Sequence, residues 1–281
     1  MSAEALQSGK GHKDENFPVA SVLIAPQYRS PVMAFYNFVR FADDIADHAT
    51  ATPEEKLRLL EEMRATLAGE SDASPEGVRL RAICDERHLT IVHALDLLEA
   101  FRRDCTKLRY RDWDELIDYC RYSAMPVGRF VLDVHGESRN LWPANDALCA
   151  ALQVINHLQD CGKDYRDLNR IYIPEDALAA AGARVEDLAA AAASPALKGV
   201  IHSLAAKNAQ LLAKSRTFAR GIGDTRLALE VDLIQTLAED LNAKLMRRDP
   251  LSENVHHSKF DAARLFLGRL PGFALSRLVR K

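Results

Sequence analysis

Four polar residues fall on one face of an otherwise apolar segment near the N-terminus. They are Tyr36, Arg40, Asp43 and Asp47. Their steps of four, three and four residues place them within an arc of about 60° on an α-helix. The other positions are mostly apolar: Met33, Ala34, Phe35, Phe38, Val39, Phe41, Ala42, Ile45 and Ala46. A helix with so many apolar residues is normally buried. We therefore predict that this first stripe lines an interior cavity; the alternative is a solvated acidic face.

A second polar stripe occurs in the middle of the chain. Its members are Gln153, Asn156, Asp160 and Asp164. On one helix they share an arc of about 80°, and the flanking positions are apolar. One such stripe is usually an exposed polar face. Two of them in one chain favour a shared interior site.

The residue types of the two stripes suit magnesium. Carboxylate and amide oxygens one helical turn apart are hard ligands of the kind that Mg²⁺ prefers. Clustered carboxylates in an apolar cavity cost several kcal/mol to desolvate, and bound cations offset that cost. The predicted metal ligands are Asp43, Asp47, Asn156, Asp160 and Asp164.

An anionic ligand must complete the coordination of ions held in this way, and diphosphate is the natural candidate. Arg40 would donate to its oxygens, and Lys163, Arg166 or Arg170 would add further donors. Metal ions and arginine would stabilise the charge on a departing diphosphate. The expected reaction is therefore ionisation, which leaves an allylic or cyclopropylcarbinyl cation in a dry, apolar pocket.

The composition is that of an ordinary globular chain with a large core. It has 281 residues, 48% of them hydrophobic, and a net charge of −3 with no concentrated basic stripe, which argues against a nucleic-acid partner. Five scattered cysteines without CxxC spacing suggest neither a disulfide framework nor a zinc site. The N-terminus has no apolar signal core, and no run of about 18 apolar residues occurs. We therefore predict a cytoplasmic protein with at most peripheral membrane contact.

No segment alternates apolar and polar residues for long enough to indicate a strand, so the predicted fold class is all-α. No linker divides the chain, which favours a single domain over 1–281, with a loose lead-in at 1–15. Pro31 is expected to begin the first helix, and Thr52 to cap the second, which Gly69 ends. The later helices are expected at about 76–88, 90–107, 112–134 with a break near Pro126, 144–165, 175–181, 185–193, 195–221 and 224–247.

The two stripes, together with RIYIP at 170–174 and the segment YCRYSAMPVGRFVLDVHG from Tyr119 to Gly136, resemble the squalene/phytoene synthase family. The resemblance is close over about 16–176 and loose over the C-terminal third. It implies an isoprenoid-synthase-type helical bundle with a central active site that holds several Mg²⁺ ions. Segments 16–21 and 123–129 look most like the branch of bacterial hopanoid biosynthesis that converts presqualene diphosphate to hydroxysqualene and diphosphate without NADPH. The near alternatives within the family condense two prenyl diphosphates head to head.

The resemblance also implies roles for individual residues. The metal ligands would be those given above, and Arg40 and Tyr172 would join them in catalysis. The implied contacts with the substrate are made by Asn16, Tyr36, Arg40, Gln153, Gln159 and Arg170. Gln159 stands where condensing relatives commonly carry arginine. Ile234 lies about where a tyrosine is often found, so the residue that positions the quenching water is open.

A few further features carry expectations of their own. Asp44 lies at the edge of the first stripe and is expected to hydrogen-bond to neighbouring groups rather than to bind metal. His48 and His157 are expected to cap or support the stripes, and His256 and His257 to be exposed. Segment 260–281 combines nine large apolar residues with five basic ones. It suits either a final docked helix or a membrane-interface helix that delivers a hydrophobic substrate, with hand-off of product to other enzymes of the squalene pathway.

Overall fold

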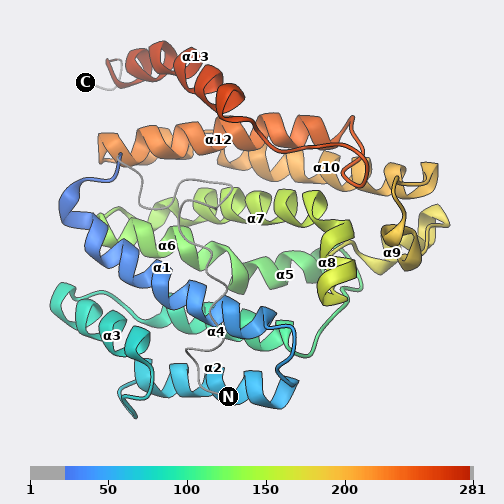
Figure 1. The fold of residues 1–281 in the computed structure, drawn as a ribbon. Helices are drawn as coiled ribbons and strands as arrows, with labels where there is room; N and C mark the ends of the chain where they lie inside the picture. The colour runs from blue at the N-terminus through green and yellow to red at the C-terminus, as the bar shows by residue number, and fades with distance from the viewer. Residues whose placement is uncertain (1–22, 279–281) are drawn as a thin grey trace. The chain divides into compact units, whose positions relative to one another are not determined.

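The structure is a computed structural model that describes residues 23–278, and within that range it contains helices and no strand (Figure 1). The only β-bridge in this part of the chain is an isolated parallel one between Arg109 and Ile171. The all-α prediction is confirmed. The helices are α1 (Pro26–Asp47), α2 (Pro53–Leu67), α3 (Pro75–Arg87), α4 (Val92–Asp104), α5 (Trp113–Ser123), α6 (Met125–Val134), α7 (Trp142–Gln159), α8 (Cys161–Leu168), α9 (Glu175–Ala181), α10 (Pro195–Ser215), α11 (Phe218–Gly221), α12 (Thr225–Leu245) and α13 (Lys259–Leu278), with short 3-10 turns η2 (Arg139–Leu141) and η3 (Val185–Ala189).

The chain divides into two compact units. The first combines Met1–Lys107 with Arg121–Arg139, and the second combines Leu108–Cys120 with Asn140–Lys281. The first therefore holds α1 to α4 and α6, and the second holds α7 to α13 and most of α5. The single-domain interpretation stays a prediction.

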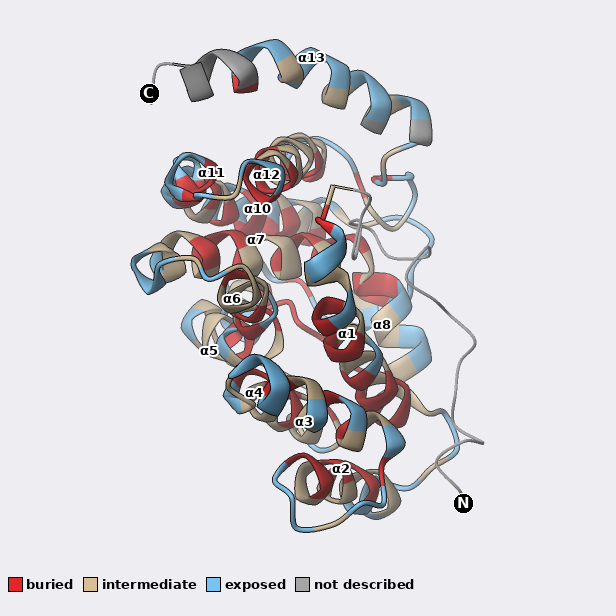
Figure 2. Cartoon of the chain, turned by 90° about the vertical axis from the view of Figure 1, so that its left-hand side faces the viewer, coloured by how far each residue is buried: buried red, intermediate tan, exposed pale blue. Residues whose placement is uncertain are grey.

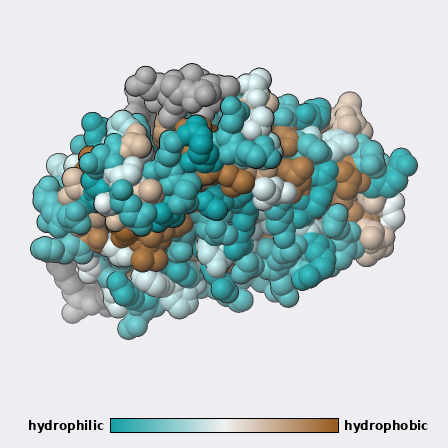
Figure 3. All heavy atoms as spheres, turned by 90° about the horizontal axis from the view of Figure 1, so that it is seen from below, coloured by the Kyte–Doolittle hydropathy of each residue, from teal (hydrophilic) through white to brown (hydrophobic). Residues whose placement is uncertain are grey.

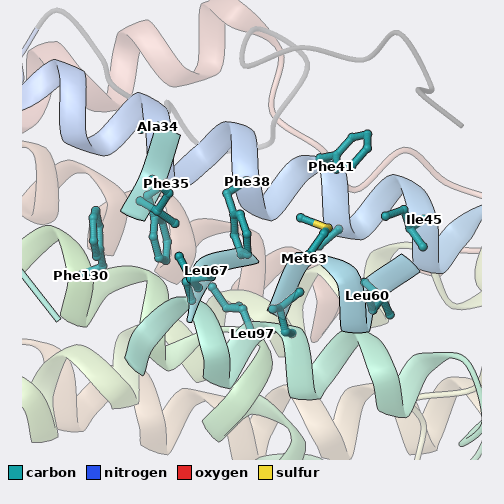
Figure 4. Packing of buried hydrophobic residues seen from close by; sticks show 14 of the residues in the cluster. Ala34, Phe35, Phe38, Phe41, Ile45, Leu60, Met63, Leu67, Leu97 and Phe130 are labelled. Atoms are coloured by element: carbon teal, nitrogen blue, oxygen red, sulfur yellow. The ribbon is translucent and has the colours of Figure 1, made fainter. Parts of the chain in front are cut away.

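The first unit is built around α1. The apolar face of this helix packs on α2, α3, α4 and α6. Figure 4 shows Phe35, Phe38 and Met63 in this core, where Phe38 is fully buried and the rings of Phe35 and Phe130 stack with centroids 4.0 Å apart. Burial on this scale fixes which face of α1 remains for polar residues, because each large apolar side chain contributes about 1.5–3 kcal/mol when it leaves water.

The predicted start of α1 at Pro31 is wrong, because the helix begins at Pro26. Pro26 occupies the first helical turn after Ala25, whose backbone is extended. Pro31 then lies inside the helix, where it cannot donate to the carbonyl of Gln27. Gln27 is exposed, so that carbonyl can be hydrated and the proline is tolerated.

The predicted boundaries of α2 are confirmed. Thr52 forms a capping box with Glu55, in which each residue's side chain accepts from the other's backbone N–H. Gly69 follows the helix with a φ of 81°, a conformation that favours glycine. The predicted break near Pro126 is also confirmed, since α5 ends at Ser123 and Pro126 lies in the first turn of α6.

The second unit is organised by α7, which packs on α10 and α12. Two buried asparagines join these three helices. Asn208 donates from Nδ2 to the carbonyl of Ala151 at 3.1 Å and to Oδ1 of Asn242 at 3.0 Å, and Asn242 donates to the carbonyl of Ala205 at 2.9 Å. Buried amides that find partners in this way select one register of helix packing.

Two predicted helices of the second unit are shorter than expected. The segment 195–221 is divided into α10 and α11 after Ser215, whose hydroxyl donates to Oε1 of Gln235 at 2.7 Å. In segment 185–193 only the turn η3 is helical, and the backbone N–H of Ala193 instead donates to Asp249 at 2.8 Å. The prediction for α9 is confirmed, and Gly182 closes it with a φ of 67°.

The last helix, α13, docks on α12 through Arg269, which binds Asp232 bidentately at 2.6 and 2.7 Å. Most of its described residues are exposed or intermediate (Figure 2), and Phe260 and Leu267 are 76% and 65% exposed. The face of the molecule in Figure 3 is mainly hydrophilic, with apolar residues in separate smaller patches. None of the helices described is long and apolar enough to cross a bilayer.

Candidate active site

The first stripe lies on α1 as predicted. Its four members, Tyr36, Arg40, Asp43 and Asp47, are each partly exposed, whereas most of the apolar residues beside them are buried. Arg40 joins the carboxylates of this helix, with 3.0 Å to Asp43 and 2.7 Å to Asp44. Asp44 is buried and its carboxylate accepts from Arg40, so the expected hydrogen bond to a neighbouring group is present.

Negative charge is in excess around Asp43. Burial and the neighbouring charge of Asp47 raise the pKa of the Asp43 carboxyl to about 7, although the charge of Arg40 opposes the shift. Asp44 and Asp104 add smaller repulsions. A nearby cation would stabilise the ionised form of a carboxyl group whose pKa is raised in this way. Carboxylates that bind metal ions have this kind of environment.

Asp104 is a part of this cluster that the sequence did not reveal. It is the last residue of α4 and is 5% exposed. No spacing relates it to the first stripe, because it reaches the stripe through the packing of α4 on α1. Its only sequence signal is an acidic residue after two arginines at the end of an amphipathic helix, which is too common a pattern to be informative.

The second stripe does not lie on one helix, so the predicted continuous helix 144–165 is wrong. Gln153 and Asn156 are on α7, Asp164 is on α8, and Asp160 is the joint between the two helices. The backbone bends at Asp160 but keeps its hydrogen bonds, from its N–H to Asn156 at 2.9 Å and from the N–H of Asp164 to Asp160 at 2.8 Å. All four side chains remain partly exposed beside buried apolar neighbours.

Gln159 lies at the bend and is 6% exposed. Its Nε2 donates to the carbonyl of Val255 at 3.0 Å, in the connector between α12 and α13. The same connector supplies Leu251, which packs so closely on Gly162 that an added Cβ would lie 2.5 Å from it. The connector therefore supports the bend at Asp160, a tertiary effect that helical periodicity cannot show.

Aromatic rings pack around the second stripe. Tyr172 stacks on His157 with centroids 3.5 Å apart and an interplanar angle of 15°. Tyr110 and Tyr119 each lie 5.5 Å from Tyr172. Burial, helped by the charge of Arg170, lowers the pKa of His157 to about 3, so its imidazole is neutral at neutral pH. Tyr110 was missed by the sequence analysis because it comes from a distant segment.

The end of α8 places Arg170 next to the second stripe. Asn169 takes a left-handed conformation with a φ of 52°, and the backbone N–H of Arg170 returns to the carbonyl of Asp164 at 3.1 Å. Arg109 binds the carbonyl and side chain of Asn169, and Ile171 donates to Leu108 at 2.9 Å. These hydrogen bonds fix the backbone from Arg170 to Tyr172, and both of these residues are buried.

The remaining predictions have mixed outcomes. His48 caps α1 and accepts from the N–H of Ala51 at 3.2 Å, as expected. His257 was expected to be exposed, which is wrong, because it is bonded to Asp240 at 2.7 Å and its side chain is 10% exposed; His256 is exposed. Asn16 and the lead-in at 1–15 lie outside the described residues. Within 23–278, no group of three or more histidine, cysteine or carboxylate residues is arranged so that it could hold a metal ion.

The chain matches the family described as squalene/phytoene synthase over residues 10–261. This chain belongs to that family, whose expected helical fold it shares.

Its relatives include the hydroxysqualene synthase of Zymomonas mobilis, which is 59% identical over 92% of this chain and 88% of the relative. The hydroxysqualene synthase of Rhodopseudomonas palustris is 58% identical over 91% and 87% of the two chains. Among solved structures, a squalene synthase from Alicyclobacillus acidocaldarius aligns with a TM-score of 0.74 and 32% identity, covering 87% of this chain and 92% of the other.

Proposed function

We propose that this chain converts presqualene diphosphate to hydroxysqualene and diphosphate. The observation that carries the proposal is the high identity to two hydroxysqualene synthases over more than nine-tenths of the chain. Both carboxylate stripes are intact, and each presents partly exposed oxygens beside buried apolar neighbours. Such an arrangement suits a substrate with a diphosphate head and a hydrocarbon body.

The donor types of the two stripes suit Mg²⁺, although no three carboxylates of the described residues form a metal-binding group by themselves. The raised pKa of Asp43 reports an uncompensated cluster of negative charge, which a divalent cation would neutralise. We assign the metal to Asp43, Asp47, Asn156, Asp160 and Asp164. When bound, Mg²⁺ would stabilise the charge that develops on the leaving diphosphate.

The other residues of the site would bind and orient the substrate. In this proposal Arg40 exchanges part of its bonding with Asp43 and Asp44 for the diphosphate oxygens, and Arg170 contributes charge from the end of α8. Tyr36 and Gln153 would contact the diphosphate or the cation, and Asn16 would add a substrate contact. Tyr172, whose ring is stacked on His157, would close the site beside the second stripe. Gln159 would support the second stripe through its hydrogen bond to Val255 in the connector. This role replaces the direct substrate contact expected from the sequence.

A product analysis tests the reaction. Purified protein is incubated with Mg²⁺ and no NADPH, with presqualene diphosphate in one sample and farnesyl diphosphate in another. We expect hydroxysqualene from the first sample alone. Presqualene diphosphate formed in the second sample would instead identify a head-to-head condensing synthase, the activity class that includes the phytoene synthase of Paracoccus, which is 27% identical over 98% of this chain.

A pair of variants on one helix tests the metal assignment. Asp164→Ala removes a proposed ligand, and Asp167→Ala removes an exposed carboxylate three residues farther along α8. We expect diphosphate release to fall by several orders of magnitude in the first variant and to stay within about twofold of wild type in the second. Near-normal turnover of Asp164→Ala, with unchanged helix content in both, would contradict the assignment.

We also propose that α13 makes peripheral contact with the inner face of the cytoplasmic membrane. Its exposed Phe260 and Leu267 lie on the same face of the helix as Arg264, while Arg269 faces α12. An apolar product would then stay in the bilayer for hand-off to the next enzyme. Replacing both Phe260 and Leu267 by serine should reduce co-sedimentation with anionic vesicles and leave turnover in detergent unchanged; unaltered co-sedimentation would contradict the contact.

A further inference from the structure

A hydrogen bond links two residues of α7 on the face that carries the second stripe. Gln153 and His157 are one helical turn apart, and Nε2 of Gln153 lies 3.1 Å from Nε2 of His157. His157 is buried, whereas Gln153 is partly exposed. The pair thus joins an accessible amide to an imidazole that the core holds in place.

The imidazole of His157 cannot easily turn. Its ring is stacked on Tyr172 and lies 6.1 Å from the ring of Tyr119. The atom of Gln153 that faces the ring is an amide nitrogen, which only donates, so Nε2 of His157 is the acceptor of this hydrogen bond.

This bond decides which end of the Gln153 amide is available to a ligand. One N–H of the amide is committed to His157, so the plane of the group is fixed and its carbonyl oxygen is the acceptor end. A fixed acceptor orients a water molecule far better than a freely rotating amide. Without the imidazole, the amide could present either its oxygen or its nitrogen.

The position of Gln153 along α7 also suits contact with a group beside the diphosphate. At a rise of 1.5 Å per residue it is about 4.5 Å along the axis from Asn156 and about 10 Å from Asp160. In the proposed reaction these two residues would hold the metal that binds the diphosphate. The amide oxygen of Gln153 would then lie about one to two helical turns from these two residues, at the level where the hydrocarbon cation would be left behind.

We propose that Gln153, oriented by His157, positions the water molecule that captures the cation. The inference rests on the proposed function. When the C–O bond to diphosphate breaks, its electron pair leaves with the diphosphate. A lone pair of the water oxygen then forms the new C–O bond while one water hydrogen bonds to the Gln153 carbonyl, and the surplus proton passes to the released diphosphate. His157 touches neither water nor substrate, so it is a positioning residue.

The first test is the variant His157→Phe, which keeps a ring against Tyr172 but removes the acceptor for Gln153. Presqualene diphosphate is supplied with Mg²⁺ in ¹⁸O-water, and diphosphate release is measured beside the ratio of labelled hydroxysqualene to hydrocarbon products that lack oxygen. We expect this ratio to fall about tenfold, the effect of one hydrogen bond, while diphosphate release stays within about threefold of wild type. Gln153→Leu should shift the ratio equally, and the double variant should shift it no further.

A rescue and a control complete the experiment. His157→Gln can place an amide oxygen near the position of Nε2 and should restore most of the hydroxylated product. An unchanged product ratio in both His157→Phe and Gln153→Leu would overturn the inference, as would a parallel loss of diphosphate release and hydroxysqualene. If His157→Phe does not fold, Gln153→Leu at the partly exposed position carries the test. Failure of wild type to release diphosphate from presqualene diphosphate would instead refute the proposed function.

Discussion

In the metal-free protein, the ionised carboxylate of Asp43 should destabilise the folded state. The variant Asp43→Asn should therefore be more stable than wild type, and inactive. Its carboxyl pKa is raised from 3.8 to about 7 by burial and by the charge of Asp47. At about 1.36 kcal/mol per pKa unit, complete shielding from water would make the ionised group cost about 4 kcal/mol. The side chain is 33% exposed, so solvent screens part of this cost and we expect about 1–2 kcal/mol.

The sign of the effect depends on pH. Because the folded pKa lies above the unfolded one, the ionised carboxylate destabilises the folded state fully above pH 7 and not at all below pH 3.8. At pH 5 about 40% of the cost should be present. The gain of Asp43→Asn should therefore be largest at pH 8 and should shrink as the pH falls.

Thermal unfolding in EDTA, followed by circular dichroism at pH 8 and pH 5, measures this gain. At about 2–4 °C per kcal/mol, the Tm of Asp43→Asn should exceed that of wild type by about 2–8 °C at pH 8 and by less than half of that at pH 5. Asp167→Asn, on the exposed side of α8, is the control and should leave Tm unchanged. A variant less stable than wild type at pH 8, or one with the same gain at both pH values, would refute the reasoning.

Three further predictions follow from the same geometry. Binding of Mg²⁺ with inorganic diphosphate should tighten about tenfold from pH 6 to pH 8, because the ionised fraction of Asp43 rises from about 10% to about 90%; a flat calorimetric profile would contradict it. Thr52→Ala should cost about 1 kcal/mol in urea unfolding through loss of the capping box, with turnover unchanged. Gln159→Leu should cost about 1–3 kcal/mol, because it strands the buried carbonyl of Val255, and should lower kcat more than it changes KM; equal turnover would show that the support for the Asp160 bend is dispensable.

Features set by neighbouring residues could be read from the sequence. The capping box at Thr52, the glycine ends of α2 and α9 and the break before Pro126 all depend on local chemistry. The breaks at Asp160 and Ser215 do not, because the partners that stabilise them, Val255 and Gln235, come from distant parts of the chain. A helical pattern continues through both positions, so periodicity alone predicts one long helix in each case.

The candidate site divides in the same way. The spacing of three and four residues predicted the first stripe correctly, because one helix places its four members on one face. The same spacing identified the members of the second stripe but not the bend at Asp160 that divides them between α7 and α8. Asp104 and Tyr110 act on the stripes only through packing, so no spacing could reveal them. His157 could be recognised as a neighbour of the second stripe, but its stack on Tyr172 and its bond to Gln153 needed the structure.

The division of the chain into two units has a consequence for synthesis on the ribosome. The first unit is not a contiguous N-terminal piece, because it needs Arg121–Arg139, and Phe130 from that piece stacks on Phe35. While Leu108–Cys120 is being synthesised, part of the apolar surface of α1 to α4 stays exposed, because α6 has not yet been made. The nascent chain is therefore expected to recruit chaperones until α6 emerges, and a stop codon just after Lys107 should yield an aggregation-prone fragment rather than a small stable domain.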